Sequence, residues 1–265
     1  MLSRVFLSMF LLASASAGLA HEFWIEPKEY QAQSGASLVA DLRNGQKFSG
    51  IALGYFSSNI ARFDLIQAGR VAPVQGRMGD VPALDTAAPG DGLLVIVHQT
   101  TPATLTYAKW AKFQAFATHK DFPNIRARHE ARGLPVDGFT ETYTRYAKAL
   151  VGIGHSRGAD AATGMETEFV ALSNPYVDDP VAGFAVQLLY QNAPRADAQI
   201  EVFDRSPQGS VVITLLRTDT QGRATIPVRP GHRYLLDAVV LRQPTGDGKA
   251  VWETLWAALS FAVPG

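Results

Sequence analysis

Short runs of β-branched, leucine and aromatic residues recur along most of this chain, and turn-forming residues separate them. Runs of this kind, bounded by Gly, Asn, Asp and Pro, are typical of the strands of an antiparallel sandwich. The pattern predicts an all-β, β-dominated chain with two β-sandwich domains. The first group of runs covers residues 37–43, 51–56, 60–66, 93–99 and 103–107. The second covers residues 167–172, 184–190, 198–203, 211–217, 224–228 and 234–241, with residues 252–263 as a candidate last strand.

The stretch between the two groups changes character, and we expect a helical insert near residues 109–147. Trp110, Phe113, Phe116 and Ala117 fall at helical spacing. Aromatic residues at this spacing are typical of a stripe that faces a core rather than of a ligand site.

The two groups of strands also suggest two domains. We expect an N-terminal β-sandwich, with its helical insert, over residues 21–165. The second domain is expected over residues 166–265 and to be immunoglobulin-like. It is similar, by fold analogy, to the small domains related to transthyretin.

The first twenty residues have the pattern of a secretory signal peptide. Arg4 precedes an apolar run over residues 5–13, and small residues crowd the stretch that follows. The run is shorter than the roughly 20 residues that a membrane span needs. We expect cleavage after Ala20, which would make His21 the first residue of the mature chain, with a cut after Ala17 as the alternative. Because the chain has no cysteine, a periplasmic location is favoured.

Composition excludes several classes of site. The 24 Lys and Arg residues balance the 24 Asp and Glu residues, so the chain lacks the charge footprint of a nucleic-acid binder. The absence of cysteine excludes disulfides, zinc–thiolate sites, iron–sulfur clusters and a thiol nucleophile. Any metal site must therefore use histidines, carboxylates, methionines or the amino terminus.

The predicted mature amino terminus is the strongest candidate site. The α-amine of His21 and its Nδ1 would close one chelate ring on a metal, an arrangement that favours copper or nickel. His98, at the end of an apolar run, is the first candidate for a further ligand, and His119 is the next. Glu22 is expected to orient the imidazole or to add an oxygen ligand. The alternative is a mobile terminus with a solvated His21.

Residues 154–158 read Gly-His-Ser-Arg-Gly, which matches the G-x-S-x-G elbow of α/β-hydrolases. In that interpretation Ser156 is the nucleophile, His232 the base, and one of Asp178, Asp204 and Asp219 the acid. Strand after strand follows, however, instead of the alternation of strands and helices that supports such an elbow. We therefore expect that Ser156 is not a nucleophile and that the chain is not an enzyme. A serine hydrolase remains the weaker alternative.

Four stretches carry a resemblance to a known family. They are His-Glu-Phe-Trp-Ile-Glu-Pro at 21–27 after the signal peptide, Lys-Phe-Ser-Gly at 47–50, residues 143–150, and the terminal domain from Phe184 with its turn at 218–223. Together they resemble a bacterial periplasmic domain of unknown function found beside nickel/cobalt uptake transporters and other metal-acquisition genes. The resemblance implies two β-sandwich domains and a metal-handling or transporter-accessory role, and His21 is the residue that it carries over.

These observations lead to one expected function and two alternatives. We expect a periplasmic protein that binds a transition metal, nickel or cobalt before copper or iron, and serves a membrane transporter or receptor of a metal uptake system. A metal-free immunoglobulin-like adaptor is the main alternative to this function, ahead of the hydrolase. We expect neither a nucleic-acid partner nor a membrane span after signal removal.

Overall fold

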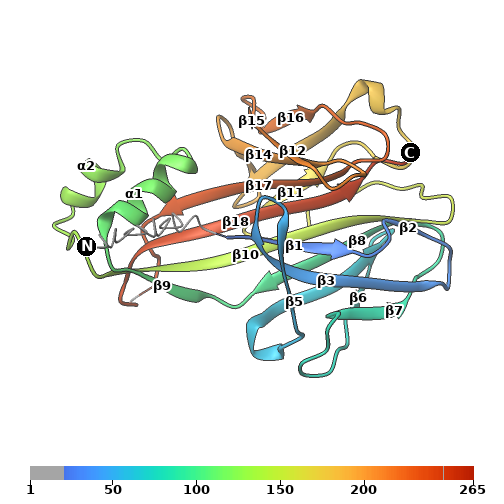
Figure 1. Cartoon of the computed structure of the whole chain (residues 1–265), viewed down its shortest axis with the longest axis horizontal. Helices are drawn as coiled ribbons and strands as arrows, with labels where there is room; N and C mark the ends of the chain where they lie inside the picture. The colour runs from blue at the N-terminus through green and yellow to red at the C-terminus, as the bar shows by residue number, and fades with distance from the viewer. Residues whose placement is uncertain (1–20, 247) are drawn as a thin grey trace, which may run out of the picture.

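A ten-stranded sheet runs through the middle of the molecule and combines strands from both halves of the chain (Figure 1). The computed structural model describes residues 21–246 and 248–265; the predicted signal peptide lies outside these residues. The sheet has the order β15 (Val211–Arg217), β14 (Gln199–Arg205), β17 (Arg233–Arg242), β18 (Ala250–Ala262), β10 (Phe139–Ile153), β8 (Gly92–Thr100), β5 (Ile60–Gln67) and β6 (Arg70–Pro73), while β2 (Gln31–Ala32) and β9 (Ala103–Tyr107) also pair with β10.

The two halves of the chain are joined by a parallel pair, β10 and β18. The register runs from Thr140 opposite Ala250 to Ala149 opposite Ser260. The predicted division at residues 165 and 166 falls in the loop between β10 and β11. Strands from both sides of that division therefore share one sheet.

A smaller sheet packs on each face of this central sheet, so the molecule has three β layers. The N-terminal sheet contains β1 (Glu22–Pro27), β3 (Ser37–Gln46), β4 (Ser49–Leu53) and β7 (Leu84–Ala87). The C-terminal sheet contains β11 (Thr167–Ala171), β12 (Phe184–Tyr190), β13 (Ala193–Pro194) and β16 (Arg223–Ile226). This arrangement confirms the predicted all-β sandwich class.

Alternating side chains of β10 supply both hydrophobic cores, because successive residues of a strand point to opposite faces. Ala147, Ala149 and Val151 belong to the core beneath the N-terminal sheet, which also contains Trp24. Leu150 belongs to the core beneath the C-terminal sheet. β10 is therefore buried on both faces over this stretch.

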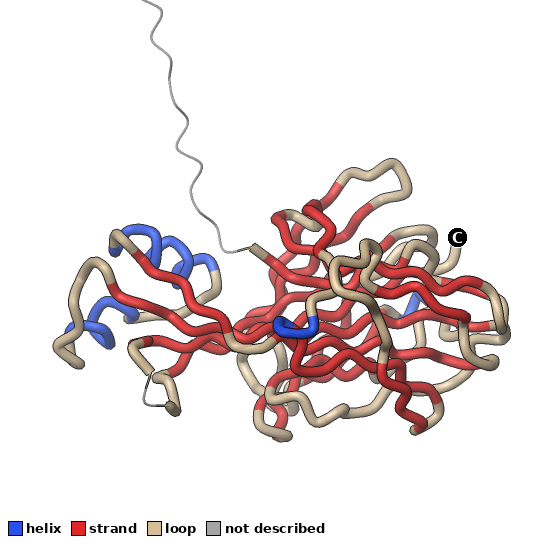
Figure 2. Tube along the Cα trace, turned by 90° about the horizontal axis from the view of Figure 1, so that it is seen from below, coloured by secondary structure: helices blue, strands red, loops and turns tan. Residues whose placement is uncertain are grey.

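Two helices cover the far end of the same long strands (Figure 2). They are α1 (Trp110–His119) and α2 (Ile125–Glu130). The predicted stripe of α1 is confirmed, because Trp110, Phe113, Phe116 and Ala117 are all buried. They form a third core with residues of β17 and β18.

The predicted helical insert was too long. Helix ends at Glu130, and residues 139–147 belong to β10. Residues 139–147 are rich in threonines and aromatic residues, which favours a strand, and β9 and β18 pair with this segment from its two sides. Two short 3-10 turns complete the elements of the described residues, η1 (Ser57–Asn59) and η2 (Pro180–Ala182). Within the described residues, no helix has both the length and the apolar character needed to cross a membrane.

Candidate functional site

The start of β1 and the end of α1 meet on one face of the central sheet. Lys120, just after α1, places its Nζ 2.8 Å from Asp237 Oδ2 on β17 and within hydrogen-bonding reach of Glu201 on β14. Its Nζ also lies 3.8 Å from Glu22 Oε1 on β1. We call these four residues the Lys120 cluster.

The Lys120 cluster holds three carboxyl groups around one ammonium group, and all four side chains are buried. Burial, and then the charge of Asp237, raises the pKa of Glu22 from 4.5 to about 7. Burial alone would lower the pKa of Lys120, but the charges of Asp237, Glu201 and Glu22 outweigh it and raise that pKa. Lys120 is therefore the cation that these three carboxyl groups surround.

His119 extends the cluster toward solvent. Its Nε2 lies 2.7 Å from Glu201 Oε1, and this hydrogen bond is the main reason why the pKa of His119 is raised. His119 is thus paired with a carboxylate that also binds Lys120.

A cavity of about 300 Å³ lies beside the cluster. We call it the seam cavity, because it is lined both by His21, the residue before β1, and by residues of α1. Strands β9, β10 and β18, helix α1 and Asn44 of β3 form its wall, and His21 also lines it.

Arg145 of β10 fixes the chain at the edge of this cavity. Its Nη1 donates a hydrogen bond to the carbonyl oxygen of His21, and its guanidinium lies 4.1 Å from the ring centre of Trp256. Phe23 and Trp24 follow at 7% and 0% exposure. The backbone of residue 21 is therefore held in place, although its side chain is exposed.

Glu141 contributes a buried carboxyl group to the wall. It accepts hydrogen bonds from the hydroxyl of Tyr107, at 2.8 Å, and from the hydroxyl of Thr254. Burial raises the pKa of Glu141 to about 6 despite these bonds. The wall thus carries a hydrogen-bonded acid as well as the basic Arg145.

The structure does not gather the four predicted metal ligands into one group. His21 lies at the seam cavity, Glu22 belongs to the Lys120 cluster, and His119 pairs with Glu201. Across residues 21–246 and 248–265, no set of three or more His, Cys, Asp or Glu side chains is arranged to hold a metal ion.

His98 lies inside the core of the N-terminal sheet. The centre of its ring is 5.1 Å from those of both Phe23 and Phe63, and only 2% of the residue is exposed. Neither ring nitrogen has a hydrogen-bond partner among the described residues. Burial lowers the pKa of His98 to about 3, so the imidazole is neutral. A metal ion could reach its nitrogens only if the surrounding side chains moved.

The Gly-His-Ser-Arg-Gly segment forms a buried turn after β10. Ser156 has a φ of 56°, which matches the strained conformation of an elbow, but it is 3% exposed. Its Oγ donates to the carbonyl of Gly154 at 3.3 Å. His232, the suggested base, does pair with Asp204, one of the suggested acids, with its Nδ1 2.5 Å from Asp204 Oδ1. The hydrogen bond of Ser156 Oγ, however, goes to the Gly154 carbonyl and not to His232. A loop leading to β11 follows Ser156, where a hydrolase elbow would be followed by a helix.

A second buried charge cluster anchors that loop. Lys148 Nζ lies 2.7 Å from Asp160 Oδ2 and 3.5 Å from Glu168 Oε2. Glu168 also accepts hydrogen bonds from the backbone of Thr163 and Gly164. With its charges paired and its backbone donors satisfied, this cluster holds the loop against the C-terminal sheet.

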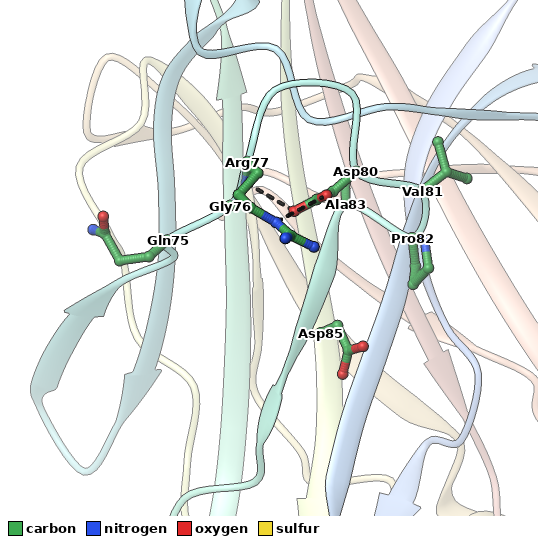
Figure 3. A pocket seen from close by; sticks show the side chains of 8 residues that line it. All are labelled: Gln75, Gly76, Arg77, Asp80, Val81, Pro82, Ala83 and Asp85. Carbon is green, nitrogen blue, oxygen red and sulfur yellow. Dashed lines mark hydrogen bonds and ion pairs between the residues drawn. The ribbon is translucent and has the colours of Figure 1, made fainter.

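A larger hollow, of about 450 Å³, lies at the loop before β7 (Figure 3). Arg77 and Asp80 line it, and they bond to each other through the Arg77 backbone N–H at 2.8 Å. The Arg77 side chain is 92% exposed. This hollow is an open loop surface, whereas the seam cavity has buried polar groups in its wall.

Sequence reasoning missed Lys120, Arg145, Glu201 and Asp237. Their common signal is a charged residue within or beside an apolar run, such as Asp237 in Tyr-Leu-Leu-Asp-Ala-Val-Val. A buried charge needs a partner, but the run does not identify that partner.

Comparisons with known proteins give one informative match. No curated protein matches the chain. Among solved structures, the D0-D1 domain of Intimin has a TM-score of 0.21 and 11% identity, and the match covers 90% of this chain and 97% of that one. A tetra-tandem repeat from the extending region of a large adhesion protein has a TM-score of 0.20 and 12% identity, covering 91% of this chain and 49% of that one. Scores this low inform neither fold nor function. The model of a domain of unknown function, DUF4198, matches residues 18–242, and the chain therefore belongs to the DUF4198 family.

Proposed function

We propose that this protein is a periplasmic transition-metal-binding protein that serves a nickel or cobalt uptake system and binds the metal through His21. The observation that supports this function is the anchoring of residue 21. Its carbonyl is bonded to Arg145, and the strand that begins at Glu22 is buried. A terminus held in this way loses little conformational freedom when it binds a metal.

The metal would be bound at an open site. Cleavage after Ala20 would give His21 a free α-amine, and this amine and the imidazole would provide two nitrogen ligands. The carboxylates of the cluster already surround Lys120, and His119 pairs with Glu201. Water or small molecules would therefore complete the coordination. Such a site suits capture and transfer of a metal better than permanent structural binding.

Calorimetry on two matched proteins tests this function. One begins at His21 with a free α-amine, confirmed by mass spectrometry, and the other has the same sequence with that amine acetylated. Acetylation converts the α-amine into an amide and supplies no new amine, so we expect Ni²⁺ and Cu²⁺ to bind at least about 10-fold more weakly. Binding should also weaken on acidification, because both nitrogens must be deprotonated to coordinate. Equal affinities for the two proteins would overturn the proposal.

A metal-free adaptor is the second candidate, and one surface favours it. β15 is an edge strand of the central sheet, and Val212, Ile213 and Leu215 on it are exposed. An exposed apolar edge strand is a surface on which a partner strand can pair. If the chain associates through this edge, Val212→Lys with Leu215→Lys should abolish association measured by light scattering, whereas the metal affinity should be unchanged.

A further inference from the structure

Arg145 is a cation in the wall of the seam cavity, and much of its hydrogen-bonding capacity is uncommitted. Its Nη1 binds the His21 carbonyl, but its Nε is buried without a partner. Within the described part of the chain, Arg145 forms no ion pair with a carboxylate. A guanidinium presents five donors in a fixed fork that matches a carboxylate. An unpaired guanidinium at a cavity is therefore a recognition element for an anion.

The orientation of this guanidinium is fixed before any ligand binds. It lies 4.1 Å from the ring centre of Trp256 and 5.2 Å from that of Tyr143. Stacking on aromatic rings holds an arginine side chain in one plane and limits the entropy lost on binding. Arg145 is thus preorganised.

The rest of the wall combines apolar surface with few charges, and the carboxylates of Asp237 and Glu22 act on Arg145 from outside the wall. Leu105, Tyr107 and Phe116 provide apolar area. Beside Arg145, the lining residues that carry a formal charge are Lys112 and Glu141, so two cations face one acid. Both oxygens of Glu141 already accept hydroxyl hydrogen bonds, from Tyr107 and Thr254.

We propose that the seam cavity binds a small organic carboxylate, whose carboxyl group pairs with Arg145 and whose apolar body packs against Leu105 and the neighbouring aromatic side chains. A pocket with mainly apolar walls and a few convergent polar groups is typical of a small-molecule site. Asn44, whose buried Oδ1 has no hydrogen-bond partner among the described residues, also lines the cavity and would accept a hydrogen bond from a donor on the ligand.

This proposal does not require a bound metal. It predicts binding to metal-free protein, whether or not the α-amine of His21 is acetylated. If the protein binds the carboxylate but no metal, the carboxylate proposal stands and the metal function fails. If it binds metal but no carboxylate, the metal function stands and the carboxylate proposal fails.

The test uses three probes and metal-free protein in the presence of a chelator. Benzoate supplies both charge and apolar body, benzamide has the same shape without the charge, and acetate has the charge without the ring. We expect benzoate to bind with a Kd of about 1 mM or tighter by ligand-observed NMR titration. Benzamide and acetate should each bind at least about 10-fold more weakly, because each lacks one of the two interactions.

Variants locate the site. Arg145→Gln should weaken benzoate binding at least about 10-fold, whereas Arg157→Gln, at an exposed arginine outside the cavity, should not. Because Arg145 also anchors residue 21, a second pair avoids any effect on folding. Leu105 is 44% exposed, so Leu105→Glu should fold normally and repel the carboxylate, while the neutral Leu105→Gln should bind benzoate more tightly than Leu105→Glu. Failure of benzoate to bind, equal binding of benzamide, or equal binding by the two Leu105 variants would overturn the proposal.

Discussion

Replacing Glu22 with glutamine should stabilise the protein, and the gain should grow with pH. Glu22 lies in the Lys120 cluster, where burial and the charge of Asp237 raise its pKa from 4.5 to about 7. A carboxyl group whose pKa is raised on folding is protonated in the folded and unfolded states below its unfolded pKa, and the folded state then has its full stability. This stability is lost as the pH rises through the folded pKa, because the folded state must then hold a buried charge. Glutamine keeps nearly the same shape and never carries the charge.

The magnitude follows from the shift. One pKa unit corresponds to about 1.4 kcal/mol, so a shift from 4.5 to about 7 costs about 3 kcal/mol when Glu22 is fully ionised. At pH 8 the Glu22→Gln variant should therefore be more stable by about 3 kcal/mol. At pH 5, where the folded carboxyl is mostly protonated, the gain should fall to about 1 kcal/mol.

Equilibrium unfolding in urea at pH 5 and pH 8, followed by tryptophan fluorescence, measures this difference. Glu29 is exposed and lies just beyond β1, so Glu29→Gln is a matched control that should change stability by less than about 0.5 kcal/mol. The reasoning is refuted if Glu22→Gln is no more stable than the parent at pH 8, or if its gain is the same at both pH values.

Two further substitutions and one labelling experiment test other parts of the structure. Lys120→Met should destabilise the protein by about 3–5 kcal/mol, because three buried carboxyl groups lose their cation; urea unfolding at pH 8 measures the loss, and an unchanged midpoint would contradict it. His98→Leu should raise the free energy of unfolding by about 1 kcal/mol, because two unpartnered nitrogens leave the core, and it should leave the Ni²⁺ affinity measured by calorimetry unchanged. Ser156 should not react with a fluorophosphonate probe, and peptide mass spectrometry showing a label there would support a hydrolase.

The strands that could be predicted from sequence are those with a continuous apolar pattern and clear turns. Residues 211–217 and 184–190 were placed at the bounds of β15 and β12. β1 and β10 were not predicted as strands. β1 is buried at all six positions, so it lacks the alternation by which half-buried strands are identified. β10 contains an Ala-Lys-Ala-Leu stretch at residues 147–150 that favours helix locally, and its pairing with β18 joins residues about 110 positions apart.

The candidate site could be only partly predicted, and the reason is physical. His21 and Glu22 stand out because they follow a cleavage signal, and the structure places His21 at the seam cavity and Glu22 in the Lys120 cluster. Arg145 and Trp256, which shape the cavity, lie directly opposite each other in the β10–β18 pair. Their proximity depends on a register between distant strands, which no local pattern specifies.

The same topology explains why charge gathers at this place in the fold. The N-terminal sheet and α1 cover adjacent parts of one face of the central sheet. The start of β1, at Glu22, therefore meets the end of α1, at Lys120. Glu201 and Asp237 lie opposite each other on β14 and β17, and two like charges in such positions repel. Lys120 offsets that repulsion from the end of α1, and it also lies near Glu22 at the start of β1. The position of residue 21, and with it any ligand bound there, therefore depends on an ion cluster assembled from four separate segments.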